Sequence, residues 1–120
     1  MLSEEVGVRL GIDVELRLAS ELDQAVGPRC ARHTVQALRE VLSNVARHSR
    51  ATAARVDVSV DENLIVLLVH DNGVGFNAPV GPGRGLRNLT SRARDLGGDS
   101  VIESAPERGT LVRWTANRLD

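Results

Sequence analysis

Polar side chains spaced four residues apart could bind a metal ion and phosphate. Glu40, Asn44 and His48, with Arg47 beside them, would share one face of a helix over 29–48. The asparagine oxygen suits Mg²⁺, which takes few protein ligands and completes its shell with water and phosphate oxygens. The glutamate could orient a water or accept a proton, and the two cationic side chains could contact phosphate. Taken alone, this spacing is more often that of a solvated helix face.

A second group lies in 70–76, with the sequence H-D-N-G-V-G-F, directly after an apolar run. Asp71 stands where the preceding strand would end, so its carboxylate could point into a pocket. Gly73 and Gly75 allow tight turning and a close approach of the backbone to a ligand. D-N-G is also common in ordinary turns, so this segment alone is only moderately specific.

The third group is G-P-G-R-G-L over 81–86, just before a predicted helix. Glycine amides and a helix N-terminus together form an anion site. A dinucleotide-binding βαβ unit is a poor match, because its glycines should follow their strand at once. The chain also lacks the Gly-Lys-Ser/Thr of a Walker loop. A flexible loop would have the same composition.

Hydrophobic periodicity predicts the elements that position these groups. Alternation indicates strands, the three-and-four spacing of Val35, Leu38, Val41, Leu42 and Val45 indicates an amphipathic helix, and the apolar run over 64–69 indicates a central strand. Together these elements predict an α+β fold, a two-layer sandwich of a mainly antiparallel sheet with helices on one face. The predicted helices are 3–11, 29–48 and 86–96, and the predicted strands are 12–18, 56–60, 64–69, 101–104 and 110–115.

Composition limits the possible functions. A chain of 120 residues with 42% hydrophobic and 26% charged residues is one globular domain. A net charge of −1 and 2% aromatic residues exclude a nucleic-acid-binding domain. The longest apolar run is far below the roughly 20 residues that span a bilayer, so no membrane contact is expected. The single cysteine, Cys30, fits the reducing cytoplasm, and no zinc-type spacing of Cys and His occurs.

Four segments, taken in order, resemble the N box, G1 box, G2 box and final strand of the GHKL ATPases, a family that includes gyrase B, Hsp90, MutL and histidine kinases. They are L-R-E-V-L-S-N-V-A-R-H, D-N-G-V-G-F, G-R-G-L-R-N-L-T-S-R-A and G-T-L-V-R-W. The chain looks most like the ATP-binding domain of a NarL-type sensor histidine kinase, the group that includes the actinobacterial DevS and DosT sensors. The resemblance covers about 11–114 and implies the Bergerat α/β sandwich, with ATP and Mg²⁺ as ligands of a single domain, 1–120.

The resemblance also implies a role for each motif. Asn44 would hold the Mg²⁺ that bridges the phosphates, and Glu40 would orient the phosphoacceptor. Asp71 would accept a hydrogen bond from the adenine amine, and Thr110 would help to bind adenine. The implied nucleotide-binding set is Asn44, Arg47, His48, Asp71, Gly73, Gly75, Gly83, Arg84, Gly85, Leu86 and Thr110.

The chain departs from the family pattern in four respects. Many NarL-type kinases have lysine at the position of Arg47, the lid over 76–85 is short, and no F box follows it. The phosphoacceptor histidine beside an acid is also missing. We therefore expect a piece of a longer kinase that dimerises through another domain, phosphorylates a histidine there and feeds a response regulator.

Two alternatives stay open at this stage. One is an anti-sigma-factor serine kinase of the same superfamily, and the other is a nucleotide-binding regulatory module without catalysis. A hydrolase of the gyrase or Hsp90 kind fits least well, because those domains are longer.

Overall fold

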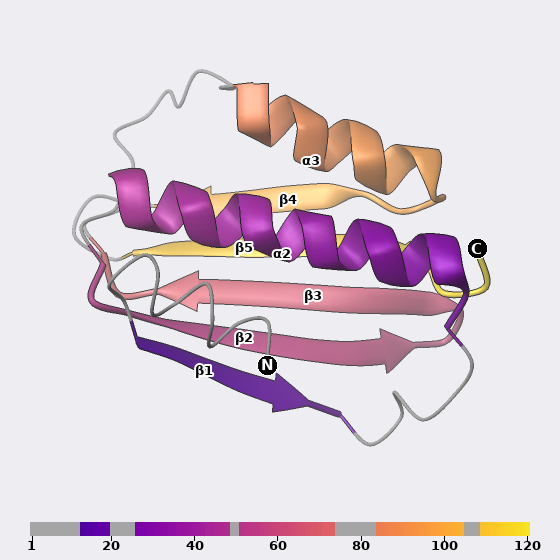
Figure 1. The fold of residues 1–120 in the computed structure, drawn as a ribbon, viewed down its shortest axis with the longest axis horizontal. Helices are drawn as coiled ribbons and strands as arrows, with labels where there is room; N and C mark the ends of the chain where they lie inside the picture. Colours follow the sequence, from indigo (N-terminus) through magenta and orange to yellow (C-terminus); the bar gives the residue numbers. More distant parts are fainter. Residues whose placement is uncertain (1–12, 20–25, 49–50, 74–83, 105–108) are drawn as a thin grey trace.

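The computed structural model describes residues 13–19, 26–48, 51–73, 84–104 and 109–120. Within these residues, five strands form one sheet, and two helices lie together on one of its faces (Figure 1). The elements are β1 (Asp13–Leu18), α2 (Pro28–His48), β2 (Ala53–Asp61), β3 (Leu64–Asp71), α3 (Arg84–Asp95), β4 (Ser100–Ser104) and β5 (Thr110–Asn117). The two-layer α+β architecture expected from the periodicity is confirmed. The helix expected over 3–11 lies outside the described residues.

The sheet has the strand order β1-β2-β3-β5-β4. Only the pair β1–β2 is parallel, and the other three pairs are antiparallel. β3 occupies the centre, as its continuous apolar run predicts, because a central strand has neighbours along both edges. The order also places the N-terminal end of β5 beside the C-terminal end of β3, where Asp71 pairs with Thr110.

The core lies between the inner face of the sheet and the apolar face of α2. Leu42 of α2 and Leu67 and Trp114 of the sheet are fully buried. Val35 was expected on the same helical face, but 40% of its surface is exposed. The buried face of α2 runs instead through Thr34 and the residues three and four positions after it, Ala37 and Leu38, and position 35 is turned about 100° away from 34.

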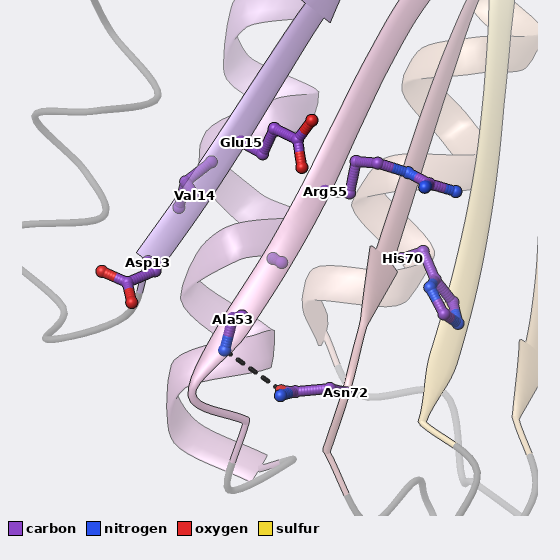
Figure 2. Close-up of a pocket in the computed structure, with 8 residues that line it drawn as sticks. Asp13, Val14, Glu15, Ala53, Arg55, His70 and Asn72 are labelled. Atoms are coloured by element: carbon purple, nitrogen blue, oxygen red, sulfur yellow. Dashed lines mark hydrogen bonds between the residues drawn. The ribbon is translucent and has the colours of Figure 1, made fainter.

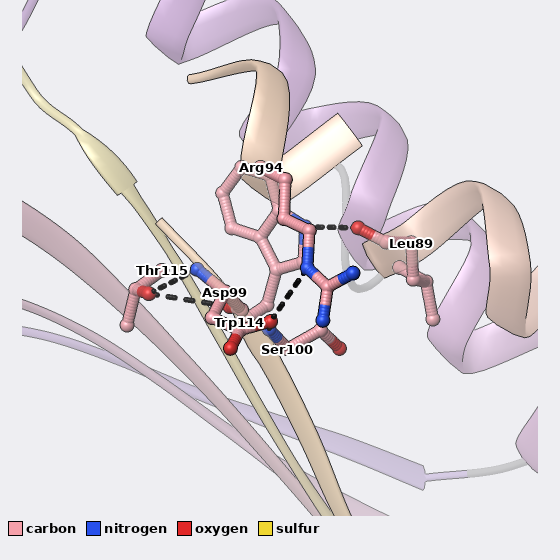
Figure 3. A network of polar contacts seen from close by, with 6 residues as sticks. All are labelled: Leu89, Arg94, Asp99, Ser100, Trp114 and Thr115. Atoms are coloured by element: carbon pink, nitrogen blue, oxygen red, sulfur yellow. Dashed lines mark hydrogen bonds and ion pairs between the residues drawn. The ribbon is translucent and has the colours of Figure 1, made fainter. Parts of the chain in front are cut away.

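Two features fix the position of α3: the glycines at its C-terminal end and a hydrogen bond to the sheet. Gly97 adopts a φ of 74°, and the amide of Gly98 bonds the carbonyl of Ala93 at 2.8 Å, so the expected Gly-Gly end of the helix is confirmed. The indole N–H of Trp114 donates to the carbonyl oxygen of Leu89 at 3.1 Å (Figure 3). A buried indole thus ties α3 to β5, and the core position expected for this tryptophan is confirmed.

The N-terminal end of α2 is capped by the end of the chain. The first amides of a helix have no partner within it. The amide of Cys30 donates to the backbone oxygen of Asp120 at 3.0 Å. The Cys30 thiol is buried, and burial raises its pKa.

Within the described residues, no helix is both long enough and apolar enough to cross a membrane.

Candidate functional site

A small cavity of about 10 Å³, the space of about one water molecule, lies between α2, α3 and the sheet. Its polar lining comes from Asn44, Asp71 and Thr110, which are distant in sequence. The rest of its wall is apolar and consists of Val41, Val45, Leu89, Ile102 and Val112. Apolar walls with a few convergent polar groups are typical of a small-molecule site.

Each polar residue is placed by its element. Asn44 lies between two cavity-lining valines of α2, in the last turn but one, and is half-buried. Asp71 is the last residue of β3, and Thr110 is the first residue of β5, directly opposite in the antiparallel register. The helix therefore supplies an amide on one side of the cavity, while the paired strand ends supply a carboxylate and a hydroxyl.

Asp71 is a buried hydrogen-bond acceptor. Only 2% of its surface is exposed. Burial raises the pKa of this carboxyl above its ordinary value, while backbone hydrogen bonds from Gly73 and Thr110 and the nearby His70 oppose the rise. The amide of Gly73 lies 2.8 Å from its Oδ1 atom. A desolvated carboxylate of this kind favours a ligand that brings its own donor.

Most of the chain matches a known protein family. The family described as histidine kinase-, DNA gyrase B- and HSP90-like ATPase matches residues 30–119. The chain belongs to this ATPase family.

Relatives and solved structures agree with this assignment. The chain is 29% identical over 116 residues to the sensor protein VraS of Staphylococcus saprophyticus, covering 94% of this chain and 33% of VraS. VraS of Staphylococcus haemolyticus is 34% identical over 92 residues, covering 73% of this chain and 26% of that protein. The chain thus spans a third or less of these relatives. The histidine kinase domain of the blue-light activated kinase of Erythrobacter litoralis has the same fold, with a TM-score of 0.80 at 20% identity, over 97% of this chain and 57% of that one.

Membership of this ATPase family implies ATP as the ligand, and the residue types that line the cavity suit the adenine base. Apolar walls suit the faces of a purine ring, and the Asp71 carboxylate suits an amine donor at the ring edge. The described residues contain no cluster of three or more His, Cys, Asp or Glu side chains that could hold a metal. Asn44 offers a single neutral oxygen, which fits Mg²⁺ only if phosphate and water supply the other ligands.

The structure does not bring every expected residue to the cavity. Glu40 is half-buried one turn before Asn44, but it does not line the cavity. The side chains of Arg47 and His48 lie outside the described part of the chain, although the backbone of both belongs to the last turn of α2. The expected roles of these two residues stay predictions.

The glycine-rich segment also stays a prediction. Arg84, Gly85 and Leu86 form the first turn of α3, but nothing beyond their backbone is described. Gly75, Gly83 and most of the lid lie outside the described residues.

Gly109 is a site residue that reasoning from the sequence missed. Its φ is 78°, a left-handed conformation, and a Cβ atom there would lie 2.1 Å from the carbonyl oxygen of Asp71. Only glycine allows the backbone to pass this close to the strand end that carries the carboxylate. The Gly-Thr pair at 109–110 was the available signal, since it begins the segment compared with the family's final strand.

We expect Gly109→Ala to weaken both stability and ATP binding. The added Cβ forces β5 away from Asp71, and a left-handed alanine costs about 1–2 kcal/mol before any clash is counted. The matched control is Gly97→Ala, because Gly97 has a similar φ of 74° but its added Cβ would meet only Asn117, at 3.8 Å. Urea unfolding and calorimetry would compare the two variants. Equal ATP affinity in both would contradict a role for Gly109 at the site.

Proposed function

We propose that this domain binds Mg-ATP and donates the γ-phosphoryl group to a histidine on a separate dimerisation domain of a two-component sensor kinase. The observation that carries the proposal is the convergence of Asn44 and Asp71 on one apolar cavity. Catalysis of phosphoryl transfer consists mainly of positioning and charge neutralisation. The Asn44 side chain is suited to the metal-bound phosphates, and the Asp71 side chain is suited to the base.

At the base end, the Asp71 carboxylate accepts a hydrogen bond from the exocyclic amine of adenine. Thr110 lies opposite it and helps to bind the ring, while Val41, Leu89 and Val112 cover the apolar faces. The buried carboxylate offers only acceptors, so it disfavours guanine, which presents a carbonyl at the same position. The site is therefore selective for ATP.

At the phosphate end, Asn44 contributes an oxygen ligand for Mg²⁺, which supplies charge neutralisation for the phosphates when bound. Arg47 and His48 belong to the next turn of α2, so phosphate contact is the role we propose for them. The backbone amides of Gly83 and Gly85 are proposed to contact the phosphates as well, because Gly85 belongs to the first turn of α3 and Gly83 precedes that helix in the sequence. Gly73 and Gly75 would let the backbone approach the base and ribose.

The acceptor histidine comes from outside this domain. Transfer forms a bond between an imidazole nitrogen and the γ-phosphorus and breaks the bond to the β–γ bridging oxygen, so ADP leaves. His70 lies on the face of the sheet opposite α2 and α3 (Figure 2), whereas the cavity lies on the face that these two helices cover. His33 is eleven residues before Asn44, or about 16 Å along the helix axis. Neither can reach a phosphate held at Asn44. We propose that Glu40 orients the incoming phosphoacceptor.

The whole protein is proposed to dimerise through the phosphoacceptor domain, to act on a response regulator and to present this domain to the cytoplasm. The finer assignment, to NarL-type kinases and to the subgroup of the actinobacterial DevS and DosT sensors, rests on the N-box and G-box sequences alone and stays a prediction. We prefer a sensor kinase to an anti-sigma-factor serine kinase because the relatives named above are sensor proteins and histidine kinases. A nucleotide-binding regulatory module without catalysis would need the same cavity, so the phosphorylation assay below separates it from a kinase.

The test is a phosphorylation assay with radiolabelled ATP. The chain alone should show no phosphohistidine, because His33 and His70 are far from the nucleotide and the proposed role of His48 is to bind the phosphates, not to accept one. Addition of a phosphoacceptor domain from the same kinase should produce acid-labile label on that domain. Stoichiometric labelling of the isolated chain at His33, His48 or His70 would contradict the proposal, as would acid-stable label on the partner.

A further inference from the structure

We propose that Asn72 is a positioning residue that holds the strand end bearing Asp71 at the distance from α2 that the nucleotide requires. The inference rests on the proposed function, because the two groups whose spacing it sets, Asn44 and Asp71, are those assigned to ATP. In the sequence, Asn72 reads as an ordinary turn residue of a D-N-G segment.

The side chain of Asn72 makes three hydrogen bonds to Thr52 and Ala53, at and just before the start of β2. Its Oδ1 atom accepts the backbone N–H groups of Thr52 at 3.0 Å and Ala53 at 3.1 Å. Its Nδ2 atom donates to the hydroxyl oxygen of Thr52 at 3.0 Å. Its own backbone amide donates to the carbonyl of Ala53 at 3.2 Å. Figure 2 shows the bond to Ala53 at the end of the sheet.

These bonds begin where the strand ladder ends. The last backbone pair between β2 and β3 is Ala54 with Asp71. The Asn72 side chain therefore takes the place of a further rung and keeps the end of β3 from fraying. Asp71 is the residue that fraying would displace first, and its carboxylate is the part of this strand that lines the cavity.

The residues that Asn72 holds are also linked to the helix on the other side of the cavity. Thr52 and Ala53 follow the C-terminal end of α2 by only a few residues, and Ala51 is buried in the core. The carbonyl of Thr52 also accepts the amide of Asp13 at 2.9 Å, which anchors this short segment to β1. Asn72 thus joins the strand that ends at Asp71 to the segment that leaves the helix of Asn44.

A displacement of Asp71 would affect binding more than folding. Asn72 and Thr52 are exposed, so water can replace the lost partners when the side chain is removed. Water cannot restore the position of the buried Asp71 carboxylate in the same way, and a small displacement of a binding group has a large effect on binding. Removal of the Asn72 side chain should therefore weaken the recognition of adenine while the chain stays folded.

The experiment compares Asn72→Ala, Asn72→Asp and the control Asn63→Ala. Aspartate keeps the oxygen that accepts the two amides, and the Thr52 hydroxyl can rotate to donate to it. Asn63 is an exposed asparagine in the turn at the opposite end of the same two strands. Calorimetry with Mg-ATP and Mg-GTP measures affinity, and urea unfolding measures stability.

We expect Asn72→Ala to raise the Kd for ATP about tenfold and to reduce the preference for ATP over GTP. Asn72→Asp should stay within about threefold of the wild type, and Asn63→Ala should be unchanged. Wild-type affinity and wild-type ATP preference in Asn72→Ala would overturn the inference, even if that variant unfolds at lower urea.

A second readout separates this inference from the proposed function. If the wild-type chain binds no ATP, the proposed function fails, and amide hydrogen exchange then decides the role of Asn72. Faster exchange at Thr52, Ala53 and Gly73 in Asn72→Ala, with recovery in Asn72→Asp, would support the tether. Unchanged exchange at these three amides would overturn it.

Discussion

Asp71→Asn is expected to weaken ATP binding by roughly tenfold to a hundredfold, because a hydrogen bond to a charged group contributes about 1.5–3 kcal/mol. The amide keeps an oxygen for the Gly73 N–H but loses the charge and one of the two acceptor oxygens of the carboxylate. The preference for ATP over GTP should fall with it. Calorimetry with both nucleotides measures the change, and Asp61→Asn, an exposed aspartate at the end of β2, is the matched control.

The same substitution should leave the fold intact or stabilise it. Burial raises the pKa of Asp71 in the folded chain. Stability from this group is therefore full below the unfolded pKa, near 3.9, and is lost as the pH rises through the folded pKa. At neutral pH the buried carboxylate costs folding free energy that the amide does not. Urea unfolding at pH 4 and pH 7 should show the variant gaining relative to wild type as pH rises. A large loss of stability at neutral pH would show that Asp71 is structural.

Asn44→Ala is expected to reduce phosphotransfer by on the order of a hundredfold or more, because a Mg²⁺ ligand contributes several kcal/mol of charge stabilisation. Adenosine, which has no phosphate, should bind this variant almost as well as the wild type. Asn44→Asp keeps an oxygen ligand and should retain part of the metal affinity. Ser43→Ala, at the neighbouring half-buried position of α2, is the control.

The readout is label transfer to the phosphoacceptor domain, together with the Mg²⁺ dependence of ATP affinity. Equal loss of adenosine and ATP binding in Asn44→Ala would contradict the metal role, because it would place this side chain at the base. Wild-type transfer in this variant would contradict the role even more directly.

Local pattern was sufficient for most of the fold. The apolar run over 64–69 predicted a central strand, and β3 occupies the centre of the sheet. The Gly97-Gly98 pair correctly marked the end of α3. Periodicity succeeds here because the burial of a helix face or strand face repeats at a fixed interval in the chain. The exposure of Val35 shows the limit of periodicity. Spacing identifies the apolar face of a helix, but it does not say how much of that face the sheet covers.

The candidate site divides in a similar way. Residue type and spacing marked Asn44 and Asp71 as candidates, and the resemblance to the ATPase family added Thr110. Only the tertiary structure placed these three in one cavity and left Glu40 out of its wall. A helical spacing of four defines a shared direction, but the neighbouring strands decide which part of that face is enclosed.

The supporting residues were decided by tertiary structure alone. Asn72 bonds a segment 19 and 20 residues earlier in the chain, and Gly109 passes the carbonyl of a residue on another strand. Neither contact produces a periodic pattern in the sequence, because each depends on where two separate strands end. Local pattern thus predicted the strands and helices that the structure describes, and it named the chemical groups. Tertiary structure decided the distances between those groups, because distances depend on contacts between segments that are remote in the chain.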